Sequence, residues 1–304
     1  MTIAETVTAA TPGGPTPPAS RASRRRRSGL TPYLLLAPGL AWLVVFFVVP
    51  MATLLELSLQ TGSYEEGYRL TWHWETYAEA LSQYRDQFFR SLVYAGLATI
   101  LALAISYPLA YAIAFKAGRW RNVLLVLVIA PFFTSFLVRT LAWKTLLGDE
   151  GWVVHVLQQV GLLGANGRLL ATPIAVVAGL TYNFLPFMTL PLYASLEKID
   201  PRLVEAAADL YCRPFTAFRR VTWPLSMPGV VAGTLLTFIP AAGDFVNVQL
   251  LGTPSSSMIG NVIQSRFLVV VDYPTASALS FTLMAAILVL VLIYIRRAGT
   301  EDLV

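Results

Sequence analysis

Six long apolar stretches constrain the fold of this chain more than any other feature. They cover approximately residues 33–57, 91–115, 123–147, 172–196, 230–251 and 275–295. A helix needs about 20 mostly apolar residues to cross the hydrocarbon core of a bilayer, and its backbone groups must be satisfied within the segment. Charged residues make up only 13% of the chain, whereas soluble domains carry about 25%. We therefore predict an all-α, polytopic membrane protein with six transmembrane helices.

The lysines and arginines set the expected orientation, because cytoplasmic loops carry an excess of both. Fifteen of the 22 basic residues lie before the first stretch or directly after the second, fourth and sixth. Both termini are therefore predicted to be cytoplasmic. The expected parts are a disordered basic tail over residues 1–32, a transmembrane domain over 33–297 and a short tail over 298–304. The first stretch is too long for a cleaved signal, and the arginine run before it indicates topology rather than nucleic-acid binding.

Several kinds of chemistry are not expected. The chain has one cysteine, Cys212, and its two histidines, His73 and His155, are far apart in sequence, so no metal site is predicted. It contains no GxxxxGK[ST] loop to hold the phosphates of ATP, and no recognisable Ser/His/Asp cluster. We expect neither catalysis nor a bound cofactor. If the chain takes part in active transport, the energy must enter through another subunit.

The segment "VEAAADLYCRPFTAFRRVTWPLSMPG", residues 204–229, interrupts the apolar stretches on the predicted cytoplasmic side. Asp200 and Pro201 are typical of a helix start, with aspartate as the N-cap and proline at the first helical position. A second short helix is expected from about Pro214. A plain connection would need only a few residues, so this segment is either a docking element or a surface hairpin without a partner.

The same residues resemble a known motif. "EAAADLYCRPFTAFRRVTWPLSMPG" is similar to the EAA loop of permease subunits in binding-protein-dependent ABC importers, which would span about residues 197–229 of this chain. The resemblance implies that this loop couples the chain to an ATPase subunit. The residues assigned to coupling are Glu205, Ala206, Ala207, Asp209, Leu210, Tyr211, Pro224 and Gly229. Tyr211 stands where many members of the family carry glycine, which puts the turn between the two short helices in question.

The resemblance extends over about residues 33–297. Three further segments, "APFFTSFLVRTLAWKTLLGDEG", "LTYNFLPFMTLPLYASLEKID" and "IGNVIQSRFLVVVDYPTASALSFTLM", are similar to permeases of spermidine/putrescine importers. This implies a multi-pass protein of a prokaryotic cytoplasmic membrane. It also implies two ATPase subunits that bind ATP and Mg²⁺, a second homologous permease chain and an extracytoplasmic solute-binding protein. The alternatives are a permease of the same family for another small solute, or a stand-alone secondary transporter.

Polar residues inside the predicted spans are candidates for a solute path, because charges in the membrane are costly and usually functional. Asp244 is expected near the middle of the fifth span, on a stripe of helical spacing formed by Thr234, Thr237, Ala241, Asp244 and Asn247. Tyr182, Asn183 and Phe184 in the fourth span are possible neighbours. Carboxylates and aromatic faces attract cations. Alternatively, Asp244 pairs with Arg139 or with a partner subunit. A structural or outer-docking role is expected for Arg139 and Asp272.

Overall fold

The structure is a computed structural model, and it describes residues 31–164 and 167–298. The predicted basic tail and the last residues of the chain therefore lie almost entirely outside the described residues. The chain divides into two compact units, Met1–Pro50 and Met51–Val304. The described part of the first unit contains α1 (Thr31–Leu43), η1 (Val44–Val48) and the first two residues of α2 (Val49–Ser58). The side chains from Leu36 to Val49 are exposed, as expected for a lipid-facing span.

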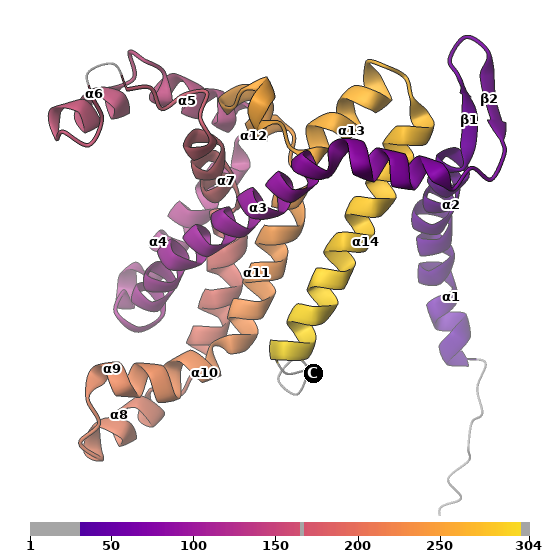
Figure 1. The fold of residues 1–304 in the computed structure, drawn as a ribbon. Coiled ribbons are helices and arrows are strands. Elements are labelled where there is room, and N and C mark those ends of the chain that lie inside the picture. The colour runs from indigo at the N-terminus through magenta and orange to yellow at the C-terminus, as the bar shows by residue number, and fades with distance from the viewer. Residues whose placement is uncertain (1–30, 165–166, 299–304) are drawn as a thin grey trace, which may run out of the picture. The chain divides into compact units, whose positions relative to one another are not determined.

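Three helices form the centre of the second unit and pack closely on one another (Figure 1). They are α3 (Glu75–Phe115), α7 (Pro173–Glu197) and α11 (Met227–Ala242). Small side chains at the contact, such as the fully buried Ala98 and Ala102 of α3, allow the backbones to approach. The last helix, α14 (Tyr273–Ala298), packs mainly on α3 and on α13 (Ile259–Leu268).

Four helices are long and apolar enough to cross a membrane, and six spans result only if each of two bent helix pairs counts as one. The four are Leu36–Ser58, Glu75–Phe115, Pro173–Glu197 and Tyr273–Arg297. They correspond to the first, second, fourth and sixth predicted stretches. The all-α, polytopic architecture is thus confirmed.

The third predicted stretch, 123–147, is broken rather than straight. η2 (Gly118–Trp120), α4 (Arg121–Ile129) and η3 (Ala130–Phe133) lead into α5 (Phe136–Leu147) and α6 (Trp152–Gln159) across a bend of 96°. Thr134 and Ser135 have extended backbones at the bend. Pro131 cannot donate a backbone hydrogen bond, which weakens the helix at this point.

The fifth predicted stretch, 230–251, is also wrong as a single helix. α11 ends at Ala242, and α12 (Val246–Leu251) begins only after a break that contains Gly243 and Asp244. Asp244 is therefore not in the middle of a span. At its other end α11 is joined at 64° to α9 (Pro214–Ala217), η4 (Phe218–Thr222) and α10 (Trp223–Leu225).

The two ends of the α3–α7–α11 core carry different structures (Figure 1). At one end lies the segment of α8 (Pro201–Asp209), α9, η4 and α10. At the other end lie α6, α12, η5 (Pro254–Ser256) and α13. The region before α3 forms an antiparallel hairpin of β1 (Gln60–Ser63) and β2 (Gly67–Leu70), in which Gln60 pairs with Leu70. The apolar pattern does not predict this hairpin, although Gly62 and Gly67, both with positive φ, flank its turn.

Candidate functional site

The stretch from Pro201 to Leu225, named the 201–225 segment, forms the two short helices that the sequence predicts. The carboxylate of Asp200 accepts a hydrogen bond from the backbone N–H of Arg202 at 3.0 Å, which caps the start of α8. α9 starts at Pro214, and the chain continues through a π-helical turn into α10. The segment is thus a built structure rather than an irregular connection.

Tyr211 lies between these helices in the left-handed region, with φ of +56°. This conformation costs a residue with a side chain about 1–2 kcal/mol, whereas glycine adopts it freely. The backbone N–H of Cys212 donates to the Ala207 carbonyl at 3.0 Å and closes the end of α8. The turn therefore keeps the geometry expected for glycine, although tyrosine occupies the position.

The tip of the 201–225 segment exposes apolar side chains to solvent. The Tyr211 side chain is 98% exposed, and Leu210 and Phe215 beside it are also largely exposed. Glu205, Ala206 and Asp209 on α8 are exposed as well. Clustered exposed apolar residues with charges around them mark surfaces for protein interaction. Of the other residues predicted to couple, Ala207 is half-buried, Pro224 is exposed and Gly229 is buried.

A second site is a buried polar cluster between α5, α7 and the α11–α12 break. The Nδ2 of Asn183 donates to Thr140 Oγ1 at 3.1 Å and to Asn247 Oδ1 at 3.0 Å. Asp244 Oδ1 accepts from the backbone N–H of Asn247 at 2.8 Å. Asn183 and Asn247 are 1% and 0% exposed. Gly179 makes room for them, because a β-carbon there would lie 2.9 Å from Asn247 Oδ1.

The structure brings together only part of the predicted solute path. Asn183, Asn247 and Asp244 form the polar cluster, and Phe184 is buried close to Phe136, with 6.2 Å between ring centroids. Tyr182 packs on Trp143 at 5.3 Å instead. The predicted stripe does not exist as one surface, because Thr234 and Thr237 lie on α11 and Asn247 lies on α12. Sequence reasoning misses Thr140, since nothing in its apolar stretch marks it as a partner of Asn183.

Arg139 is buried in α5 and does not pair with Asp244. Its guanidinium lies over the rings of Phe132 and Phe136, at 5.0 and 5.7 Å from their centroids. Nε and Nη1 have no hydrogen-bond partner in the described part of the chain. The ion pairs found between described residues do not include Arg139. The Arg139–Asp244 alternative is therefore not what the structure contains, and aromatic rings stabilise the cation instead.

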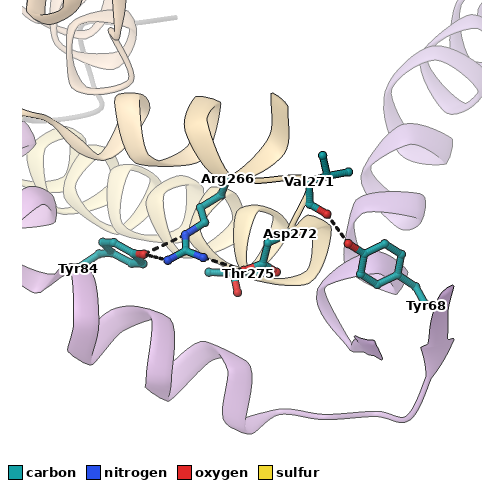
Figure 2. A network of polar contacts seen from close by, with 6 residues as sticks. All are labelled: Tyr68, Tyr84, Arg266, Val271, Asp272 and Thr275. Atoms are coloured by element: carbon teal, nitrogen blue, oxygen red, sulfur yellow. Dashed lines mark hydrogen bonds and ion pairs between the residues drawn. The ribbon is translucent and has the colours of Figure 1, made fainter. Parts of the chain in front are cut away.

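Asp272 belongs to a polar network (Figure 2), which lies at the end of the core away from the 201–225 segment (Figure 1). Its Oδ2 accepts from Arg266 Nη1 at 3.2 Å, and its Oδ1 accepts from the backbone N–H of Thr275 at 3.2 Å. Arg266 also donates from Nε to the Tyr84 hydroxyl at 2.9 Å. These bonds fasten α13 to α3 and cap the start of α14. A structural role for Asp272 accounts for all of them.

The hairpin joins this network through Tyr68. The Tyr68 hydroxyl donates to the carbonyl of Val271 (Figure 2). Its ring lies 5.4 Å from that of Tyr273. Burial raises the pKa of Tyr68 above its ordinary value of 10.0, so the hydroxyl stays protonated and able to donate. The β1–β2 hairpin is thus anchored to the corner between α13 and α14.

Comparison with known proteins places this architecture in a family. The family model described as "Binding-protein-dependent transport system inner membrane component" matches residues 106–298. The spermidine/putrescine transport system permease protein PotB of Haemophilus influenzae is 40% identical over 257 residues, which cover 84% of this chain and 90% of that protein. PotB of Escherichia coli K12 is 36% identical, covering 84% of this chain and 94% of that protein. The E. coli inner membrane ABC transporter permease protein YdcU is 35% identical, covering 71% and 72%.

Solved structures show the same fold. The crystal structure of a bacterial ABC transporter that imports the acidic polysaccharide alginate has a chain that matches with a TM-score of 0.65 and 19% identity, covering 90% of this chain and 96% of that chain. The chain belongs to the family of inner membrane components of binding-protein-dependent transport systems. Within that family it is a permease subunit of an ABC importer, a multi-pass membrane protein that transports rather than catalyses.

Proposed function

We propose that this chain forms part of the membrane pathway of an ABC importer for a polyamine such as spermidine or putrescine. The observation that carries the solute assignment is the 36–40% identity to PotB proteins over 84% of the chain. The second candidate is a permease of the same family for another small solute, since YdcU, at 35% identity, is described only as an ABC transporter permease.

The proposed assembly contains other chains. Two ATPase subunits would bind ATP and Mg²⁺, and a second, homologous permease would complete the pathway. A binding protein outside the membrane would deliver the solute. Both termini and the 201–225 segment would face the cytoplasm, because the excess of lysine and arginine lies on that side. The residues that would contact an ATPase are the exposed ones among those predicted to couple, namely Glu205, Ala206, Asp209, Leu210 and Tyr211.

The proposed solute path passes the buried polar cluster. Asp244 offers a carboxylate, and only one of its oxygens, Oδ1, accepts from the Asn247 backbone. Asn183 Oδ1 is buried without a hydrogen-bond partner in the described part of the chain. An ammonium group needs acceptors such as these once it leaves water. Asn183, Asn247 and Asp244 would therefore receive the solute, with Phe184 beside them as an aromatic wall.

Co-purification tests the assembly. The chain is tagged in its own membrane, extracted gently and analysed for associated proteins, as wild type and as Glu205→Ala. Glu65→Ala serves as the matched control, because Glu65 is an exposed glutamate in the turn of the β1–β2 hairpin. We expect an ATPase and a second permease with the wild type and the control, and less ATPase with Glu205→Ala.

Two results would contradict the proposal. A wild-type chain that purifies without an ATPase and still moves solute in liposomes without ATP would be a secondary transporter. Normal ATPase recovery and normal ATP-dependent uptake with Glu205→Ala would remove the role assigned to α8. Binding of spermidine and putrescine to the associated binding protein then decides between a polyamine and another solute.

A further inference from the structure

The base of the 201–225 segment is tied to α3 by a buried hydrogen bond. The Tyr107 hydroxyl lies 2.7 Å from Ser226 Oγ, and both residues are buried. Ser226 Oγ also donates to the Trp223 carbonyl at 2.9 Å. A serine hydroxyl has one proton, so Tyr107 is the donor and Ser226 the acceptor.

Ser226 occupies the joint between the segment and the membrane core. It separates α10 from α11, where the helix axis bends by 64°. Its own N–H reaches the carbonyls of Thr222 and Trp223, at 3.0 and 3.2 Å. Any rotation of the 201–225 segment relative to α11 must therefore change the surroundings of this serine.

The Tyr107 ring holds the same joint by packing. Its centroid lies 5.2 Å from the Trp223 ring and 5.6 Å from the Phe218 ring, which meets it edge-on at 88°. Phe218 opens the π-helical turn Phe218–Thr222. Such turns are rare and occur frequently at functional sites. The Tyr107 ring thus contacts the last turns before the joint, and its hydroxyl contacts the joint itself.

Two helices, α7 and α3, lie beside the joint and contact it in different ways. A β-carbon at Gly229 would lie 2.6 Å from the Pro191 carbonyl oxygen, so the start of α11 is fixed closely against α7. In α3, Pro108 follows Tyr107 directly. Proline removes one helix hydrogen bond and allows a helix to bend. Each of the two helices thus has a proline near the joint, Pro191 in α7 and Pro108 in α3, and Tyr107 connects the joint to α3.

We propose that Tyr107 is a positioning residue that transmits movement of the 201–225 segment to α3. Its hydroxyl bond to Ser226 and its ring contacts with Phe218 and Trp223 link the segment to the helix turn beside Pro108. This inference rests on the proposed function, because a docked ATPase would supply the movement. When the segment rotates, the pull on Tyr107 bends α3 and alters the core that α3 forms with α7 and α11.

The test compares conservative variants in the assembled importer. Complexes of the full chain with its ATPase, partner permease and binding protein are reconstituted in liposomes with Tyr107→Phe, Ser226→Ala, or both. Tyr111→Phe is the matched control. Tyr111 lies one turn further along α3 with its ring 6.4 Å from Phe218, and its hydroxyl has no hydrogen bond within the described residues. The readouts are the rate of ATP hydrolysis and the labelled spermidine imported per ATP hydrolysed.

We expect Tyr107→Phe and Ser226→Ala each to lower import per ATP about 2- to 10-fold, the range of one net hydrogen bond. The double variant should lower import per ATP by less than the product of the two single effects, because both substitutions remove the Tyr107–Ser226 bond, although Ser226→Ala also removes the bond to the Trp223 carbonyl. Assembly and ATP hydrolysis without binding protein should stay within the range of the control. Import per ATP equal to that of Tyr111→Phe in assembled complexes would overturn the inference alone. A wild-type chain without an ATPase would overturn the proposed function and this inference with it.

Discussion

Tyr211 has two features that are each unfavourable for a tyrosine in the isolated chain. Its φ of +56° is unfavourable for tyrosine, and its side chain is almost wholly exposed in the isolated chain. Strain of this kind persists where surrounding structure or function requires it. If the 201–225 segment docks on an ATPase, contact between the Tyr211 ring and that subunit compensates for the strain.

Two substitutions at Tyr211 distinguish the effect of the backbone strain from the effect of losing the ring. Tyr211→Gly should relieve about 1–2 kcal/mol of strain, whereas Tyr211→Ala keeps it. Hydrogen exchange of the Cys212 backbone N–H, which donates to the Ala207 carbonyl, measures local opening of the turn in the detergent-solubilised chain. We expect this exchange to be slower for Tyr211→Gly than for Tyr211→Ala. Both variants should recover less ATPase than wild type. Equal exchange rates would show that the left-handed conformation is not kept in solution.

Substitutions of the amide pair Asn183–Asn247 test whether the buried polar cluster stabilises the fold or lies on the solute path. Asn183→Leu leaves Asn247 buried without its partner, and we expect a loss of about 1–3 kcal/mol in stability. The double variant Asn183→Leu with Asn247→Leu should recover most of that loss, since both polar groups are gone. Thermal unfolding of the detergent-solubilised complex measures this. If the double variant is stable and still imports solute at the wild-type rate, the cluster does not lie on the solute path.

At the scale of helices, α11 is held against α7 by two glycines one turn apart. A β-carbon at Gly229 would meet the Pro191 carbonyl and Ser195, while one at Gly233 would meet the sulfur of Met188 at 2.8 Å. The Pro191 carbonyl oxygen is backbone and would lie at 2.6 Å, whereas the nearest atom at Gly233 is in the flexible Met188 side chain and the nearest backbone atom, the Met188 carbonyl oxygen, would lie at 3.1 Å. The two positions should therefore tolerate a methyl group differently.

Alanine substitutions measure this helix contact. We expect Gly229→Ala to cost about 1–3 kcal/mol by overpacking, and Gly233→Ala to cost less. Gly96→Ala in α3 is the control, because a β-carbon there would meet no atom within 4 Å and alanine favours helix over glycine by about 1 kcal/mol. Thermal unfolding in detergent gives the order. A Gly229→Ala variant as stable as Gly96→Ala would contradict the close α7–α11 contact.

The breaks within helices mark the limit of what the sequence can predict at this scale. The stretches 172–196 and 275–295 agree closely with α7 and α14, because membrane thickness fixes the length of a continuous apolar helix. The bends near Ser135 and Gly243 are not predicted, because the sequence stays apolar across both of them. Apolar composition indicates that a segment leaves water, but it does not indicate in which direction its backbone runs. The helices of the 201–225 segment are predictable, because Pro201 and Pro214 mark their starts.

At the scale of the whole molecule, the family and the architecture follow from the sequence, and the site follows only in part. The residues predicted to couple lie in one local segment, and their prediction needs no tertiary information. The bond from Asn183 to Thr140 and the bond from Tyr107 to Ser226 join residues far apart in the chain. No local pattern reports such pairs, so only the packing of α3, α5, α7 and α11 reveals them.

If the proposed function is right, this chain moves solute only as part of an ATP-driven assembly. Uptake of labelled spermidine into liposomes that contain the purified complex tests this dependence. ATP is supplied on the side of the membrane that the 201–225 segment faces, and the binding protein is supplied on the opposite side. We predict uptake with ATP and none with a non-hydrolysable analogue or without the ATPase subunits. Equal uptake by the chain alone, with no ATP present, would show instead that it works as a stand-alone transporter.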